Sequence, residues 1–230
     1  MGVHALIVVE IAPSDIGVEN AYESGDWDAV WAQCLRDSLG VRPVRPGSWL
    51  VALSEFGDDA SIDGLLRRRA LDEEGRPRGP ETLSPLLGGC GFDSGSDPLR
   101  AKRVGWAPKL PGSPTGLLPG CCHDLADLEV WLDVAEAVEL SKRRLSIGHA
   151  TLSVSVEGGV VDIVEEPETF TAEPVRYRFS QREMKATLAH AVRLRDEFER
   201  RLRRGLCRLG VAEVNEIASV LCGRDTSGDD

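Results

Sequence analysis

The most regular hydrophobic pattern in this chain is an alternation of apolar and polar residues. Residues 151–156 and 160–165 follow this alternation on either side of a Gly-Gly pair. Two alternating segments joined by two glycines predict a β-hairpin with a two-residue turn, in which Val156 pairs with Val161. Because residues 175–179 continue the alternation, a third strand is expected beside the hairpin.

Other segments place apolar residues in short runs, which predict strands, or three and four positions apart, which predict helices. The predicted strands are 5–11 and 49–53, and the predicted helices are 27–39, 59–71, 124–144, 181–206 and 211–222. The helix at 181 has the clearest start, because Ser180 and Glu183 have the spacing of a capping box. Its acidic and basic residues four positions apart, such as Glu199 and Arg203, are typical of a solvated helix face.

Residues 75–120 fit neither pattern. The segment contains eight of the 13 prolines and ten of the 24 glycines of the chain, so almost no regular structure is expected there. Its scattered apolar residues, among them Phe92 and Trp106, favour an ordered irregular segment packed on the body of the protein over a flexible linker.

Together these elements predict an α+β fold with a mostly antiparallel sheet, helices packed on one side of it and a long irregular Gly/Pro-rich insertion. We expect a single domain over residues 1–223, which includes the irregular segment 75–120, followed by a disordered tail at 224–230. The alternative is two lobes, 1–74 and 121–223.

The net charge of the chain limits the classes of partner that it can bind. Its 230 residues carry a formal net charge of -11, which repels nucleic acid and anionic membranes and attracts a basic protein. Residues 182–208 are the exception, with nine Lys and Arg against four Asp and Glu. We interpret this segment as a surface helix whose positive charge is neutralised by acidic neighbours. The alternative is phosphate or RNA binding through Arg200–Arg204, which the negative net charge of the chain disfavours.

The sequence predicts a cytoplasmic protein with mostly free thiols. No apolar run reaches the roughly 18 residues that a membrane-spanning helix needs, and no basic region precedes the apolar residues 5–12. Disulfides are rare in the cytoplasm. Cys34 and Cys207 fall within helical patterns and are predicted to be small core residues.

The candidate chemistry lies in the pentad 120–124, Gly-Cys-Cys-His-Asp. A cysteine at a helix N-terminus loses its proton more readily than a free one. Cys121 or Cys122, activated by His123 or His149, would therefore be a candidate nucleophile.

A zinc site is the second chemical hypothesis for this pentad. Its ligands would be Cys121, Cys122 and His123, with Cys90 or His149 as the fourth. The spacing argues against it, because structural zinc sites prefer two to four residues between neighbouring ligands. The glycine-rich stretch 87–95 lacks the Lys-Ser/Thr ending of a phosphate-binding loop, and no cofactor is expected.

Two features resemble bacterial protein families. One is a Cys-Cys-x-Asp-Leu box followed by a tryptophan, found in bacterial proteins of uncharacterised function; here it is the string 121–125 with Trp131. The other is the closing part of immunity-type proteins from toxin–antitoxin neighbourhoods, which Gly148-His149 and the strand-to-helix ending from Tyr177 to Leu202 resemble.

The resemblance implies a cytoplasmic, acidic, non-catalytic protector, and it assigns no catalytic residue. The leading hypothesis is therefore a bacterial protein-binding module, and more specifically an immunity protein that neutralises a basic toxin or effector. The alternative is a small thiol- or zinc-dependent enzyme centred on Cys121, Cys122 and His123.

Overall fold

The computed structural model forms two compact units, which we describe separately. It describes residues 4–17, 26–83, 85–93, 116–117, 124–145, 151–166 and 174–224. Unit 1 consists of Met1–Leu6, Gly89–His123 and Asp127–Val192, and unit 2 of Ile7–Gly88, Asp124–Ala126 and Arg193–Asp230. In the described part of the chain, no helix is both long and apolar enough to cross a membrane.

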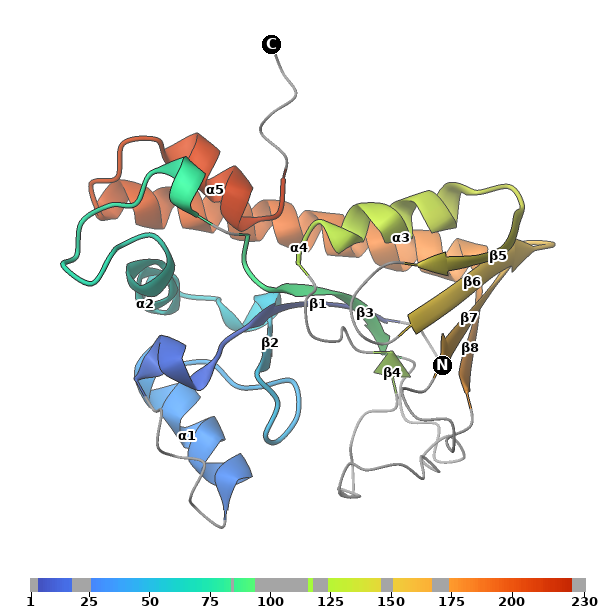
Figure 1. The fold of residues 1–230 in the computed structure, drawn as a ribbon, viewed down its shortest axis with the longest axis horizontal. Coiled ribbons are helices and arrows are strands. Elements are labelled where there is room, and N and C mark those ends of the chain that lie inside the picture. Colours follow the sequence, from blue (N-terminus) through green and yellow to red (C-terminus); the bar gives the residue numbers. More distant parts are fainter. Residues whose placement is uncertain are drawn as a thin grey trace. The chain divides into compact units, whose positions relative to one another are not determined.

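Unit 1 contains a four-stranded antiparallel sheet in the order β5-β6-β7-β8 (Figure 1). Its strands are β5 (Leu140–Leu145), β6 (Thr151–Glu157), β7 (Val160–Glu166) and β8 (Val175–Ser180). Val156 pairs with Val161 across the Gly-Gly turn, which confirms the predicted hairpin and its register. The third predicted strand is β8, which pairs with β7 along its length.

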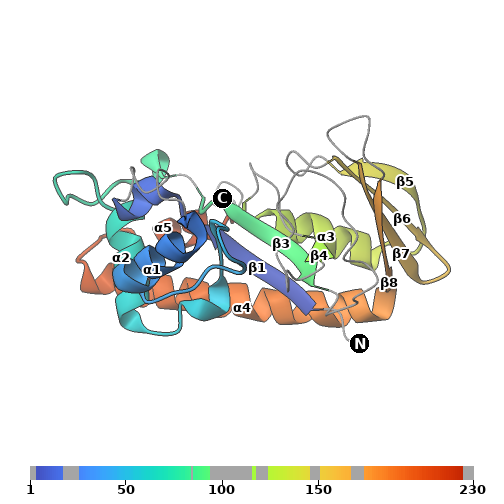
Figure 2. The same ribbon diagram turned by 90° about the horizontal axis from the view of Figure 1, so that it is seen from below.

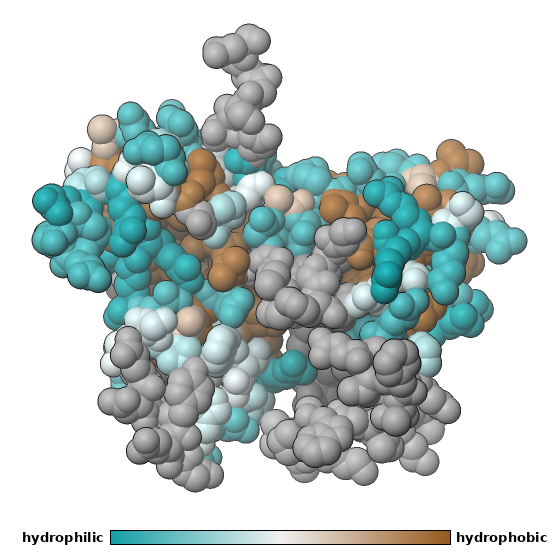
Figure 3. Space-filling model, viewed as in Figure 1, coloured by the Kyte–Doolittle hydropathy of each residue, from teal (hydrophilic) through white to brown (hydrophobic). Residues whose placement is uncertain are grey.

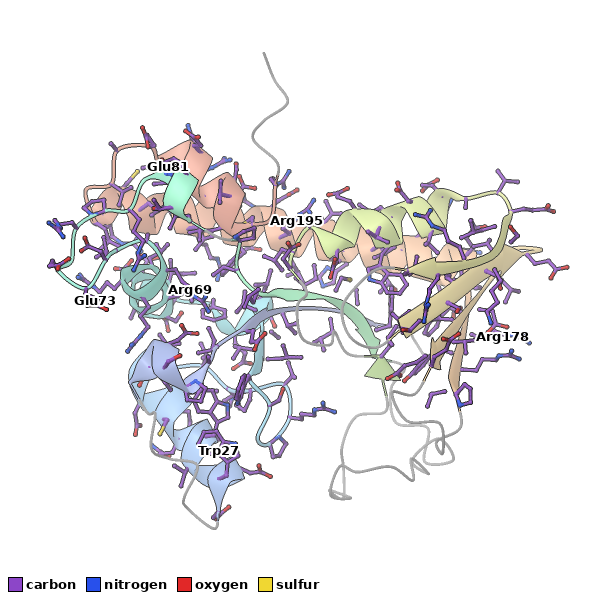
Figure 4. All side chains as sticks on the ribbon, viewed as in Figure 1. Trp27, Arg69, Glu73, Glu81, Arg178 and Arg195 are labelled. Atoms are coloured by element: carbon purple, nitrogen blue, oxygen red, sulfur yellow. The ribbon has the colours of Figure 1, made fainter. Side chains whose placement is uncertain are left out.

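Helices pack on one face of this sheet. Helix α3 (Asp127–Glu136) and the first turns of α4 (Gln181–Arg208) lie on the same face in both ribbon views (Figures 1 and 2). The ring of Phe92 lies 5.1 Å from the ring of Trp131 in α3 and 5.5 Å from the ring of Phe179 in β8. On the opposite face, Arg178 pairs with Asp162 at 2.9 Å (Figure 4). The sheet therefore has one apolar face and one polar face, as its alternating sequence predicts.

The predicted helix 124–144 is wrong in its second half, because α3 ends at Glu136 and β5 follows it. The side-chain amide of Gln181 donates hydrogen bonds to the carbonyls of Ala135 at 2.7 Å and Ala137 at 2.6 Å. These bonds satisfy carbonyls that would otherwise be unpaired at a helix end. The apolar spacing continues past that end, but pairing with β6 decides the structure of the next residues.

The capping box at the start of α4 is confirmed. The backbone N–H of Glu183 donates to Oγ of Ser180 at 3.2 Å, and the backbone N–H of Ser180 donates to the Glu183 carboxylate at 3.2 Å. Helix α4 then runs to Arg208, two residues beyond the predicted end.

A second antiparallel sheet has the order β2-β1-β3-β4, so the prediction of one sheet is wrong while the α+β class is confirmed. Its strands are β1 (His4–Glu10), β2 (Leu50–Ala52), β3 (Gly88–Asp93) and β4 (Gly116–Leu117). Strands β3 and β4 lie within segment 75–120, where almost no regular structure was expected. Glycine weakens a strand that has no neighbour. Here, however, Gly88 has no Cβ and can therefore lie close to the backbone of Val8 in β1.

The helices of unit 2 pack closely around two glycines. They are α1 (Trp27–Leu39), α2 (Asp59–Arg69), the second half of α4, and α5 (Val214–Leu221), with 3-10 turns at Pro13–Ile16, Leu53–Glu55 and Pro80–Thr82. A Cβ on Gly64 of α2 would lie 2.8 Å from Leu39 of α1. A Cβ on Gly205 of α4 would lie 2.5 Å from Leu66 of α2. Both glycines therefore allow the helix backbones to approach.

The four cysteines among the described residues are free thiols. Cys90 and Cys222 are buried, Cys34 is half-buried, and Cys207 is exposed. The prediction of Cys207 as a core residue is therefore wrong. The spacing of helix α4 places it beside Arg204 and Arg208 on the outward side, although it follows the buried Leu206 directly.

Candidate functional site

Most residues of the two chemical hypotheses lie outside the described part of the structure. These are Cys121, Cys122, His123 and His149. The thiol and zinc hypotheses therefore stay predictions. Cys90 is described and lies buried in β3. Within the described ranges, no group of three or more His, Cys, Asp or Glu residues is arranged to hold a metal ion.

The glycine-rich stretch 87–95 is largely a strand. Its described residues from Gly88 onward form β3, which pairs with β4 through Phe92 and Leu117. Its glycines would favour a turn in an isolated segment, but pairing with neighbouring strands makes its described residues a strand. A phosphate-binding loop needs backbone N–H groups turned toward one point, whereas a strand directs them to its neighbours.

Segment 124–126, which begins at the last residue of the pentad, belongs to unit 2. Asp124 forms a β-bridge with Leu87, and the backbone N–H of Ala126 donates to Oδ1 of Asp124 at 2.7 Å. Gly223, at φ +66°, packs so closely that a Cβ on it would lie 2.5 Å from the nitrogen of Ala126. The C-terminal boundary of the pentad is therefore fixed by close backbone contacts.

Helix α4 contributes a buried charged cluster to the same region. Arg195 and Glu199 are each only 4% exposed, and a guanidinium N–H of Arg195 donates to the carbonyl of Leu125 at 3.5 Å. Arg195 lies in the middle of α4 (Figure 4). A solvated face was predicted for Glu199 and its pair with Arg203, and for the buried Glu199 that prediction is wrong.

Glu199 is the centre of this cluster. Its carboxylate pairs with Arg203 one turn along α4 and with Nε of Arg224 at 2.8 Å. It also accepts a hydrogen bond from Oγ of Ser219 in α5 at 3.2 Å. Arg224 pairs in addition with Asp196 of α4. A buried carboxylate is tolerated when cations and donors surround it in this way.

Cys222 lies beside the cluster and is fully buried. Burial is the largest cause that raises the pKa of its thiol, to about 12, and the negative charge of Glu199 adds to the effect. A thiol with such a pKa is almost entirely protonated at neutral pH and is a poor nucleophile. Cys222 is therefore a structural residue and not a candidate nucleophile.

The charged positions of this cluster could have been found from the sequence. Leu188, Arg195 and Leu202 are spaced seven residues apart, so Arg195 falls on the apolar stripe of the helix. Glu199 lies between two residues of that stripe, Phe198 and Leu202. Charged residues on an apolar stripe indicate a buried ionic cluster, because an unpaired charge would not be stable there.

A second half-buried cluster joins β1 to α2. Arg69, at the C-terminal end of α2, donates to Oδ2 of Asp15 at 2.8 Å and to the carbonyl of Glu10 at 3.0 Å (Figure 4). Arg69 is half-buried, whereas Arg67 and Arg68 directly before it are exposed. Burial raises the pKa of Glu10, although the charge of Arg69 opposes this effect and that of Asp15 adds to it.

Replacing Glu10 by Gln is expected to stabilise the protein at pH 7. A carboxyl whose folded pKa is raised contributes stability below its unfolded pKa of 4.5 and loses that contribution as pH rises through the folded pKa. The Glu10→Gln variant should therefore melt at a higher temperature than the wild type at pH 7, and the difference should shrink toward pH 4. The exposed Glu73→Gln is the control, and an equal shift in both variants would contradict the prediction.

Helix α3 presents a row of acidic residues to solvent. Glu129, Asp133 and Glu136, spaced four and three apart, are all exposed; we call them the α3 acidic row. Glu136 pairs with Lys185 at 2.9 Å, at the surface. The exposed Glu139 follows, next to Val138, an apolar side chain that is 88% exposed. Hydrophilic residues cover much of the visible side of α3 and the adjoining sheet (Figure 3).

The basic residues of α4 are largely engaged within the fold. Arg201 pairs with Glu197 and also donates to the carbonyl of Phe56. Arg208 pairs with Asp63 at 2.7 Å and with Asp59 at 3.1 Å. The exposed Arg200 and Arg204 flank these ion pairs.

Glu197 interrupts the exposed arginines, since it lies three and seven residues before Arg200 and Arg204 on the same side of the helix. Its pKa is lowered mainly by its hydrogen bond from Arg201, and the charges of Arg200 and Arg204 contribute. The interpretation of 182–208 as a helix neutralised by acidic neighbours thus agrees with the ion pairs of its second half.

Comparisons with known protein families, with curated proteins and with solved structures find no match.

Proposed function

We propose that this protein is a non-catalytic protein-binding module of the bacterial cytoplasm, and more specifically an immunity protein that neutralises a basic toxin or effector. The observation that carries the proposal is the distribution of charge. Arg201, Arg203 and Arg208 of α4 pair with carboxylates of unit 2, whereas the carboxylates of the α3 acidic row are exposed. Since the chain carries a formal net charge of -11, exposed carboxylates of this kind would attract a basic partner.

The neighbourhood of α3 supports this choice. From Asp124 to Ser141 the chain contains six Asp and Glu residues and no Lys or Arg. Like charges on one helix face repel each other and cost stability at that surface. A basic partner would remove this repulsion, and the exposed side chain of Val138 would add apolar contact at the end of the row.

Expression together with the product of the adjacent gene tests the proposal directly. We expect that product to inhibit growth when expressed alone, and this chain to restore growth and to co-purify with it. A neighbouring product that is toxic but is neither bound nor neutralised by this chain would contradict the proposal.

Neutralising the α3 acidic row is expected to slow association with that partner. The triple variant Glu129→Gln, Asp133→Asn, Glu136→Gln should lower the association rate constant about tenfold at low salt and less at high salt, because steering depends on charges near the interface. The measurement is stopped-flow or surface-based kinetics over a range of ionic strength.

A control variant changes the net charge by the same amount elsewhere. Glu73, Glu213 and Glu216 are exposed carboxylates of unit 2. Their triple replacement by Gln should slow association much less than the α3 variant does. Equal effects of the two variants would show that total charge, and not the α3 surface, drives the encounter. An association rate that does not change with salt would exclude electrostatic steering altogether.

A further inference from the structure

We propose that α5, Arg224 and segment 124–126 of unit 2 form one local unit, the clasp, which opens away from α4 as a whole. In the closed state the side chain of Arg224, which we call the latch, holds the clasp against α4. The proposal does not depend on the identity of a partner.

The latch makes ionic contacts on two turns of one helix. Arg224 pairs with Asp196 and, at 2.8 Å, with Glu199 of α4. Its backbone N–H donates to the carbonyl of Ser219 at 3.0 Å, which closes the C-terminal end of α5. One side chain therefore ties the end of α5 to α4. Ser219 of α5 also donates a hydrogen bond to Glu199.

The clasp also holds the chain that follows the pentad. Gly223, next to the latch, lies against the backbone of Leu125 and Ala126, with 2.5 Å between an added Cβ and the nitrogen of Ala126. Arg195, from the same charged cluster, donates to the carbonyl of Leu125 at 3.5 Å. If Arg224 is released, Gly223 loses its anchor, and segment 124–126 keeps the β-bridge from Asp124 to Leu87 and the contact with Arg195.

Only three consecutive residues, Asp124–Ala126, bring this part of the chain into unit 2. So short a segment cannot be stable without the contacts on either side of it. Opening of the clasp therefore frees the residues joined directly to the Cys-Cys-His sequence of 121–123. The clasp controls how firmly the C-terminal end of the pentad is anchored.

Cys222 is a natural reporter of this opening. Its thiol is fully buried next to Glu199 in the closed state, and it lies between Leu221 and Gly223. Alkylation of Cys222 therefore requires that the clasp open. Cys207 is exposed on α4 and reports the unprotected rate, whereas Cys90 is buried in β3 of unit 1 and reports unfolding of that unit.

The experiment is peptide-resolved alkylation of the folded full-length protein with a maleimide, followed by mass spectrometry. Cys222 in the wild type should react far more slowly than Cys207. In Arg224→Gln we expect Cys222 to react about tenfold faster or more, because a lost contact of the closed state shifts the local opening equilibrium. Cys90 should stay as slow as in the wild type. The control is Arg200→Gln, an exposed arginine of α4, which should leave Cys222 protected.

Hydrogen exchange of the peptide that contains Leu125 and Ala126 provides the second readout. Its exchange should accelerate in Arg224→Gln together with alkylation of Cys222. Faster alkylation without faster exchange would contradict the coupling of the two segments. Equal acceleration of Cys222 and Cys90, or equally accelerated hydrogen exchange in the buried helix α2 of unit 2, would show wider destabilisation in place of a clasp. Unchanged Cys222 would exclude Arg224 as the latch.

Discussion

The Glu199→Gln variant is expected to lose about 3 kcal/mol of unfolding free energy, the lower end of the cost of breaking a buried ion pair. Glu199 is 4% exposed and pairs with Arg203 and Arg224. Without its negative charge, Arg203 loses its ion pair with Glu199, and Arg224 keeps the pair with Asp196. We expect the low end because Arg203 and Arg224 keep 40% and 38% of their side-chain surface in contact with water.

Glu197→Gln is the matched control for this prediction, because it removes a carboxylate two positions away on the same helix. Glu197 pairs with Arg201 near the surface, with 45% of its side chain exposed, so water replaces the lost interaction and the change should be much smaller. Urea unfolding followed by far-UV circular dichroism measures both variants. If the two variants lose equal stability, the Glu199 cluster is no more important than a surface ion pair.

Elements whose signals are local could be predicted from the sequence. The hairpin 151–156/160–165 depends on alternation and on a Gly-Gly turn, and its register is as predicted. The start of α4 depends on Ser180 and Glu183, which are three residues apart and bond to each other. In both cases, neighbours in sequence supply the contacts that define the structure.

Elements that depend on distant partners could not be predicted in this way. The helical spacing of 124–144 continues through β5, but pairing with β6 and the caps from Gln181 end the helix at Glu136. Strand β3 forms in a glycine-rich stretch because it pairs with β1 on one side and with β4 on the other. Local propensity is overridden by tertiary contacts at both places.

The candidate site likewise has features that depend on local sequence and features that depend on distant contacts. Composition and spacing identify Cys121, Cys122 and His123 as unusual residues, but they do not indicate what surrounds them. The cluster around Glu199 was missed, because pairs such as Glu199 and Arg203 have the spacing of a solvated face. Their position relative to Phe198 and Leu202, both buried, is the signal that distinguishes a buried pair from a solvated one.

Gly88→Ala is expected to lower the unfolding free energy by about 2–3 kcal/mol, in the range of overpacking substitutions in a core. A Cβ at Gly88 would lie 2.1 Å from the carbonyl oxygen of Val8 and 3.0 Å from Cα of Val9. These are backbone atoms of β1, so no side-chain rotation relieves the clash and β3 must move away from β1. Val8 and Val9 also pair with β2, which limits how far β1 can yield.

Gly57→Ala is the control, because the same substitution meets little at that position. The nearest atom to an added Cβ there is the carbonyl oxygen of Ser54 at 4.0 Å, and the change should lie within about 0.5 kcal/mol of the wild type. Denaturant unfolding of both variants compares them directly. A Gly88→Ala protein as stable as Gly57→Ala would mean that β3 does not lie against β1 as described. The glycine-rich stretch would then be free to adopt the turn that its composition suggests, and Asp124 would lose the β-bridge to Leu87 that supports segment 124–126.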